Sequence, residues 1–233
     1  MFSLSSAEQD DLAAFMMVFP TDVAPIVGQQ VTLTQAVLAG ANADSVNARA
    51  DLILARAGAS FTSEILGGAT TECEAIARVV ESAGTTPIGY LRQAGGNFLP
   101  DDGSPAITSV ALRAKATVAG QEVTLTCVPP GSGNRMAIDR DEDGVLNGVD
   151  NCPGSPNGAL GGTCTAGDAM LLATECTSNG ECGTGGVCSL TQEDTDVDTV
   201  GDACEPRLVP EPGFGIGLLF GCAALLRSRR RGH

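Results

Sequence analysis

The feature that most constrains this chain is a run of oxygen-bearing side chains at fixed intervals between residues 139 and 153. Counted from the first Asp, they fall at positions 1, 3, 5, 9 and 12, with glycine at position 6 and a backbone carbonyl available at position 7. The residues are Asp139, Asp141, Asp143, Gly144, Val145, Asn147 and Asp150. Alternate residues turning inward around a sharp, glycine-permitted bend are typical of a twelve-residue Ca²⁺ loop. The spacing therefore predicts an irregular loop wrapped around calcium.

A second copy of the spacing lies downstream. Its expected ligands, at positions 1, 3, 5, 7, 9 and 12, are Asp194, Asp196, Asp198, the carbonyl of Val200, Asp202 and Glu205. Position 6 is Thr199, and a β-branched residue resists the positive φ that glycine adopts freely. We therefore expect the second site to be weaker than the first. An acidic run can also be a solvated, disordered stretch, but two matches to the spacing, each next to a cysteine, argue against it.

Each of the two loops is followed by, or contains, a short motif with a cysteine. Residues 139–153 read DRDEDGVLNGVDNCP, and residues 194–205 read DTDVDTVGDACE. Asp-x-Asp-x-Asp-Gly with Asp-Asn-Cys-Pro, followed by Gly-Asp-Ala-Cys, resembles the thrombospondin type 3 repeat, a calcium-wrapped, disulfide-stapled module of extracellular proteins. The resemblance implies a disulfide between Cys152 and Cys204, across an insertion of about forty residues. It also carries an association with adhesion.

Charge supports a cation in this region. Residues 139–205 contain fourteen acidic side chains and a single basic one, Arg140. Such a density repels itself unless divalent cations neutralise it. Many oxygen ligands favour Ca²⁺ over Zn²⁺, copper or Mg²⁺, and the only histidine is His233, which effectively excludes a histidine-based site. A formal charge of −15 and a pI of about 4.2 argue against a nucleic-acid partner.

The nine cysteines indicate an oxidising compartment. Six lie in the 53 residues from Cys152 to Cys204, in a Gly/Thr/Ser-rich segment with little core of its own. Zinc is the competing use, but paired Cys-x-x-Cys spacings are absent. The connectivity inside the insertion is open, and its CTSNGECGTGGVC stretch is similar to a small epidermal-growth-factor-like or other disulfide knot. We expect a separate pair between Cys73 and Cys127, which leaves Cys222 unpaired.

Residues 209–233 resemble a bacterial sorting signal. They comprise a Val209-Pro210-Glu211-Pro212 box, an apolar stretch from Phe214 to Leu226, and Arg227, Arg229, Arg230 and Arg231. This resembles the PEP-CTERM tail of Gram-negative bacteria, which an exosortase removes. Thirteen apolar residues span about 20 Å as a helix, short of a ~30 Å hydrocarbon core, which suits transient membrane insertion with the arginines inside. The resemblance implies export to the cell envelope or surface and an exosortase-like processing partner.

The N-terminus differs from a signal peptide. MFSLSSAEQDDLAAFMM has no basic start and places acids where a signal peptide is apolar, so we expect the export signal upstream of Met1. Residues 1–20 predict an amphipathic helix with Leu12, Phe15, Met16 and Phe19 on one face. LSSAEQDDLAAFMM is similar to the closing helix of cytochrome c or di-haem peroxidase domains, but the chain has no Cys-x-x-Cys-His motif for haem.

Residues 21–137 predict a small α+β domain. Alternation and turn residues predict strands at residues 31–38, 87–93, 97–100 and 122–128. Apolar spacing of three and four predicts helices at residues 41–58 and 107–120. The sequence contains no nucleophile elbow, phosphate loop or paired catalytic acids, so no reaction is assigned. A boundary is expected near Pro129-Pro130-Gly131, and residues 154–165 predict a linker.

The predicted architecture is therefore a small α+β domain, an irregular calcium-wrapped, disulfide-rich thrombospondin type 3 repeat region at residues 138–206, and a C-terminal hydrophobic helix at residues 209–233. One expected function is a non-enzymatic, calcium-binding, exported surface or matrix protein, structural or adhesive, whose protein or polysaccharide partner the sequence does not reveal. The alternative is the C-terminal accessory region of an exported enzyme, such as a c-type cytochrome or peroxidase. A Cys-x-x-Cys-His motif upstream of Met1 would favour the alternative.

Overall fold

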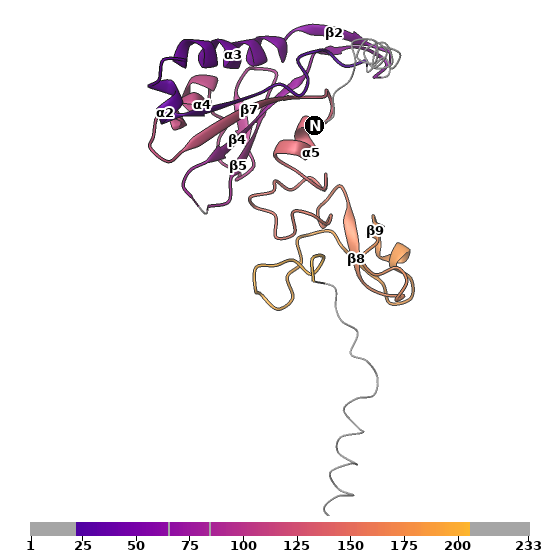
Figure 1. Ribbon diagram of the computed structural model, residues 1–233. Coiled ribbons are helices and arrows are strands. Elements are labelled where there is room, and N and C mark those ends of the chain that lie inside the picture. The colour runs from indigo at the N-terminus through magenta and orange to yellow at the C-terminus, as the bar shows by residue number, and fades with distance from the viewer. Residues whose placement is uncertain (1–21, 65, 84, 206–233) are drawn as a thin grey trace, which may run out of the picture.

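The computed structural model describes residues 22–64, 66–83 and 85–205. The helix expected within residues 1–20 and the tail at residues 209–233 lie outside the described residues. In the part that is described, no helix is long and apolar enough to cross a membrane. The chain there is a small mixed α/β structure, rich in irregular segments and closed by four disulfides (Figure 1).

A five-stranded antiparallel sheet forms the larger half of the structure. Its strands are β1 (Gln30–Thr34), β4 (Glu74–Val80), β5 (Ile88–Arg92), β6 (Phe98–Pro100) and β7 (Glu122–Val128), in the order β1-β7-β4-β5-β6. Side chains alternate across a strand, so β7 buries Val123 and Leu125 in the core and directs Thr124 and Thr126 to the opposite face. One face of the sheet is therefore apolar, and the other, called the polar face, carries Thr124, Thr126 and Arg78 together with Ile76 and Leu91.

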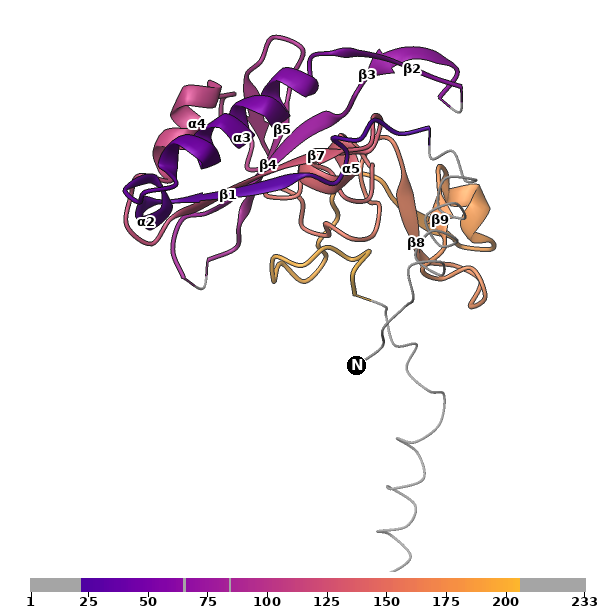
Figure 2. The ribbon, with the colours of Figure 1, turned by 45° about the horizontal axis from the view of Figure 1, so that its top comes forward.

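Helices cover the apolar face. They are α2 (Gln35–Leu38), α3 (Ala43–Arg56) and α4 (Ser109–Lys115). Ala50 and Ile53 of α3 and Leu112 of α4 are buried in the same core cluster as the apolar sheet residues. Figure 2 shows α3 and α4 on one side of the sheet, with α5 and the irregular segments on the other. The polar face is thus the one on the side of the first calcium-type loop (Figure 2).

The predicted elements are largely confirmed, with shorter bounds. The prediction of a strand across residues 31–38 is wrong in its second half: the Oγ1 of Thr34 accepts a hydrogen bond from Val37 N (3.2 Å), and this cap starts α2. Strand β4 and the hairpin of β2 (Ser60–Ser63) and β3 (Gly68–Thr71) were not predicted. The disulfide predicted between Cys73 and Cys127 is present, and it ties the start of β4 to β7.

Helix α5 (Gly133–Ala137) lies against the polar face of the sheet, on β4 and β5. The amide of Gly133 donates to Glu74 Oε2 (2.6 Å). A Cβ at Gly133 would come within 2.7 Å of Glu74 Oε2 and of Leu91 Cδ1, so glycine is what lets the helix approach this closely. The first loop begins two residues after α5, and its Gly148 N donates to the carbonyl of Asp101 beyond β6 (3.0 Å).

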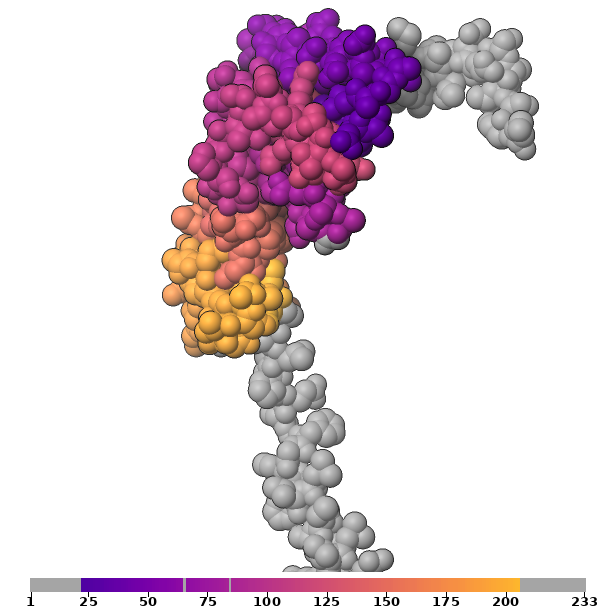
Figure 3. All heavy atoms as spheres, turned by 90° about the vertical axis from the view of Figure 1, so that its left-hand side faces the viewer, coloured from indigo at the N-terminus to yellow at the C-terminus, as the bar shows by residue number. Residues whose placement is uncertain are grey.

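The insertion between the two loops has its own small fold. It contains β8 (Gly162–Ala166), β9 (Glu175–Cys176), the 3₁₀ helix η1 (Asn179–Cys182) and β10 (Val187–Ser189), with strand order β10-β8-β9. The prediction of a linker at residues 154–165 is therefore wrong from Gly162 onward. A Cβ at Gly162 would stand 2.2 Å from the carbonyl of Ser189, so this glycine reflects close packing. Figure 3 shows the salmon-coloured part of the chain lying against the sheet domain, with the yellow part, which holds the second loop, farthest from it.

Candidate metal centre

Three hydrogen bonds from backbone amides to side-chain oxygens close the first loop within its own twelve residues. Position 1 accepts from the amide of position 6, position 5 from position 7, and position 9 from position 2. The pairs are Gly144 N to Asp139 Oδ2 (3.2 Å), Val145 N to Asp143 Oδ1 (2.8 Å) and Arg140 N to Asn147 Oδ1 (2.9 Å). Positions 4 and 6, Glu142 and Gly144, have positive φ angles of 60° and 91°.

The second loop repeats this backbone at the same positions. Its pairs are Thr199 N to Asp194 Oδ2 (3.0 Å), Val200 N to Asp198 Oδ1 (2.8 Å) and Thr195 N to Asp202 Oδ1 (2.9 Å). Positions 4 and 6 again have positive φ, 62° at Val197 and 82° at Thr199. Thr199 thus adopts the positive-φ conformation for which the loop pattern favours glycine. The strain at Val197, a second β-branched residue with positive φ, was not predicted.

Carboxylate oxygens converge in the first loop without protein partners. One oxygen from each of Asp139, Asp141 and Asp143 lies within 4.8 Å of the others. Asp139 Oδ1, both oxygens of Asp141 and Asp150 Oδ2 are buried and have no hydrogen-bond partner among the described residues. An unpaired buried polar atom costs about 1–3 kcal/mol, and more when charged. A hard divalent cation would pair all four oxygens at once, so this donor set fits Ca²⁺.

The crowding of these acids also changes their protonation. Burial, followed by the charges of Asp143 and Asp150, raises the pKa of Asp141 to about 6. Burial likewise raises the pKa of Asp150, although Asp150 Oδ1 accepts a hydrogen bond from Cys152 N (2.7 Å). The ionised form of Asp141 is thus disfavoured until an opposite charge joins the cluster.

Two amide side chains that the sequence analysis missed support the first loop. Asn157 is fully buried, and its backbone N donates to Asp143 Oδ2 (2.8 Å). The side chain of Asn157 bonds to those of Asn151 and Gln192. Their positions in the sequence are the signal that could have identified these two residues. Asn157 lies five residues after Cys152, and Gln192 lies two residues before the second loop.

The two loops are joined across the insertion. Cys152 and Cys204 form a disulfide with a Cα–Cα distance of 5.5 Å, as the family resemblance implied. Asn151 N donates to Gln192 Oε1 (2.9 Å), and Gly201 N donates to the carbonyl of Asn151 (2.9 Å). The segments on either side of the insertion therefore pack together as one unit.

The second loop gathers its acids in a more open setting. Oxygens of Asp194, Asp196 and Asp198 also lie within 4.8 Å of one another, but Asp194 is half-buried and the other two are exposed. Backbone amides already bond both oxygens of Asp194. The charges of Asp196 and Asp198 raise the pKa of Glu205, which places this position-12 carboxylate near the cluster.

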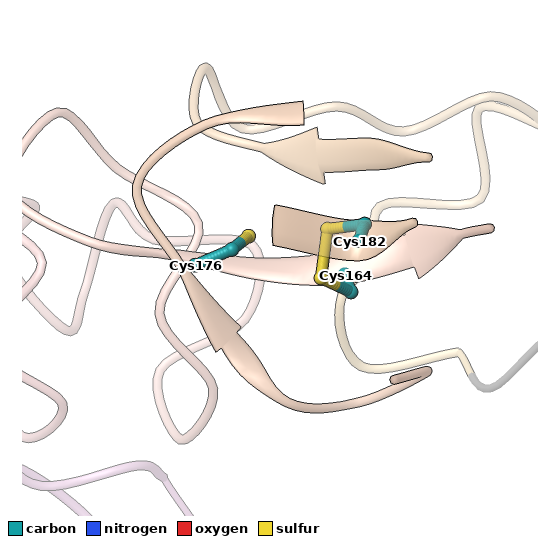
Figure 4. A group of neighbouring side chains, drawn as sticks. All are labelled: Cys164, Cys176 and Cys182. Carbon is teal, nitrogen blue, oxygen red and sulfur yellow. A yellow bond between two sulfur atoms is a disulfide. The ribbon is translucent and has the colours of Figure 1, made fainter. Parts of the chain in front are cut away.

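A group of three cysteines, Cys164, Cys176 and Cys182, is also close enough for a metal ion. Their sulfurs are instead committed to disulfides, Cys164 to Cys182 and Cys176 to Cys188. Figure 4 shows the Cys164–Cys182 bond with Cys176 beside it. The four half-cystines form the buried core of the insertion, with Leu190 packed against them. The sequence left the connectivity of these four cysteines open. In the structure, the first cysteine of the insertion pairs with the third and the second pairs with the fourth.

A family model of the thrombospondin type 3 repeat matches residues 138–160 and 193–206, which are the two loops with their flanks. Repeats of this family bind calcium, so the match supports a calcium-binding protein, and its disulfide-rich character is consistent with an exported one. The sheet domain and the insertion lie outside the matched residues. No curated protein and no solved structure matches the chain.

Proposed function

We propose that this chain is a non-enzymatic, calcium-binding protein of the bacterial cell surface or matrix, in which a calcium-stiffened repeat region carries the sheet domain. The observation that carries the proposal is the set of four buried carboxylate oxygens on Asp139, Asp141 and Asp150 that lack protein partners. The proposed ligands are those expected from the spacing, with the position-9 side chains Asn147 and Asp202 acting through water, as is common at that position.

Export to the envelope of a Gram-negative bacterium is part of the proposal. It is supported by four disulfides, which persist in oxidising compartments, and by the sorting-signal resemblance of residues 209–233. We propose that this tail is cut near its Pro-Glu-Pro box after transient insertion. The intact mass of protein released by the native host should lack residues 213–233. A mature form that keeps Arg229 to Arg231 would make the tail a permanent anchor.

Calcium calorimetry on the full, oxidised chain tests the metal site. The unmutated protein should release or absorb heat with Ca²⁺ at a dissociation constant of roughly 10⁻⁵ to 10⁻³ M, the range of extracellular modules. The informative variant is Asp141→Asn, because Asp141 oxygens make no protein hydrogen bonds that the change would break. Asp44→Asn, an exposed acid in the first turn of α3, is the matched control. A flat titration of the unmutated chain would refute calcium binding.

A further inference from the structure

A groove of about 720 Å³ lies where the repeat region meets the sheet domain. Its floor is the polar face of the sheet, with Arg78 on β4 and Thr124 and Thr126 on β7. Its opposite wall includes Arg135 from α5 and Arg140 from the first loop. The groove thus joins the two halves of the molecule, and calcium binding does not account for it.

Three arginines line this groove in a chain whose formal charge is −15. Arg78, Arg135 and Arg140 are all exposed, and among the described residues none of them forms an ion pair or a side-chain hydrogen bond. Each guanidinium offers five donors in a planar fork that matches a carboxylate.

Two acids, Asp101 and Asp102, also line the groove. Asp101 is nearly buried, and Asp102 Oδ1 accepts a hydrogen bond from Ser104 N (2.9 Å) within its own turn. Neither is within ion-pair distance of an arginine among the described residues. The three arginines therefore remain available to an anionic ligand.

The floor of the groove limits what that ligand can be. β7 and β4 are interior strands with hydrogen-bonded neighbours on both sides, so a peptide cannot add to them as a further strand. Recognition has to come from side chains, and the groove offers guanidinium, hydroxyl and amide groups beside apolar ones such as Ile76 and Met136. No aromatic residue lines the groove, the chain has no Trp, and its single Tyr, Tyr90, is buried in the core. Stacking on a neutral sugar is therefore not available.

We propose that this groove binds an acidic oligosaccharide through its uronate groups. The carboxylates would form charge-assisted hydrogen bonds with Arg78 and Arg135. The sugar hydroxyls, which both donate and accept, would pair with Thr126, with the Nδ2 of Asn147, whose Oδ1 accepts from Arg140 N, and with Thr124, whose Oγ1 also bonds to Thr32 Oγ1 (2.9 Å). Because Asn147 belongs to the first loop, the bound saccharide would contact both the sheet domain and the repeat region.

The test uses the full, oxidised chain in saturating Ca²⁺ and a hexasaccharide of alternating glucuronate and N-acetylglucosamine. Calorimetry should show binding that weakens about tenfold or more in the Arg78→Gln/Arg135→Gln variant, because each substitution removes charge-assisted hydrogen bonds. Both residues lie outside the calcium loops, so calcium titration of the variant should be unchanged. Arg49→Gln on α3, an exposed arginine on the opposite side of the sheet, is the matched control.

The proposal would be overturned by no binding of the hexasaccharide at millimolar concentration, by equal binding by the double variant, or by equal binding of the carboxyl methyl ester. A hexaglutamate peptide that binds as tightly as the saccharide would show a general anionic surface and would also overturn it. Thermal unfolding of each variant verifies the fold. If the double variant does not fold, Arg135→Gln alone, on the exposed side of α5, should still weaken binding severalfold.

Discussion

The two calcium-type loops have the same backbone and different surroundings. Each has three internal hydrogen bonds at equivalent positions and positive φ at positions 4 and 6. In the first loop Asp143 is fully buried and Asp139 is 5 % exposed, whereas in the second Asp196 and Asp198 are exposed. Among the described residues, buried side-chain oxygens without a hydrogen-bond partner occur in the first loop only.

The difference shows that the residue spacing determines the backbone frame of such a loop, meaning its internal hydrogen bonds and its positive φ angles. Packing against the rest of the chain determines how deeply the loop is buried. The frame follows from the sequence because each of its hydrogen bonds joins residues at most seven apart. Burial of the first loop comes from elsewhere: Leu160 N donates to the carbonyl of Asp143 (2.9 Å), Asn157 supports its carboxylate, and Gly148 bonds to the sheet domain. We therefore expect the first loop to be the tighter site.

The largest expected effect comes from separating the loops. The double change Cys152→Ala and Cys204→Ala removes the bond that closes the insertion, and loss of a native disulfide costs about 2–5 kcal/mol. Both calcium sites should weaken, and urea unfolding should shift to lower concentration. The change Cys176→Ala with Cys188→Ala is the control, since it opens the insertion and leaves the joint between the loops intact. Unchanged calcium affinity after loss of Cys152–Cys204 would show that the loops are independent.

Equivalent substitutions at position 3 of each loop should affect the two calcium sites differently. Asp141→Asn should weaken the tighter class of calcium sites by about tenfold or more, because calcium affinity follows the charge of the ligands. Asp196→Asn should weaken only the looser class. A two-site calorimetric fit to each variant measures this. If Asp196→Asn weakens the tighter class, the order of the loops is reversed.

The first loop should also respond to pH. A pKa of about 6 for Asp141, raised above its ordinary value, means that protons compete with calcium below that pH. Its calcium affinity should be about tenfold weaker at pH 5 than at pH 7. Without calcium, the pH dependence of folding stability has the opposite sign. The folded state disfavours the ionised form of Asp141, so the contribution of Asp141 to stability falls as pH rises from about 4 through 6. Melting curves with chelator and with calcium should therefore slope in opposite directions over this interval.

The smallest effect concerns the glycine position. Thr199→Gly removes strain on the order of 1 kcal/mol at a positive φ, and should tighten the second site about fivefold. Thr184→Gly, the same substitution at a residue without positive φ, should leave calcium binding unchanged. A looser second site in the Thr199→Gly variant would contradict the strain argument.

Much of the site was predictable because its information is local. The spacing gave the register of both loops, including the positive φ of Thr199, and the family resemblance implied the Cys152–Cys204 bond. The strand β4 was equally readable, since Ala75, Ala77 and Val79 alternate into the core, and was overlooked. The start of α2 was not readable from alternation, because a single cap at Thr34 ends the strand.

By itself, the sequence determined the backbone of each calcium-type loop and the disulfide-rich character of the region between them. Only the tertiary structure decided which loop is buried, since Asn157, Gln192 and Leu160 act from outside the twelve-residue spacing. It also decided that Gly133, Gly148 and Gly162 are sites of close packing, where a Cβ would meet other backbone or side-chain atoms within 3 Å. In the sequence, a glycine in a flexible linker looks the same as a glycine at a tight contact. Only the neighbouring atoms in the folded structure distinguish the two.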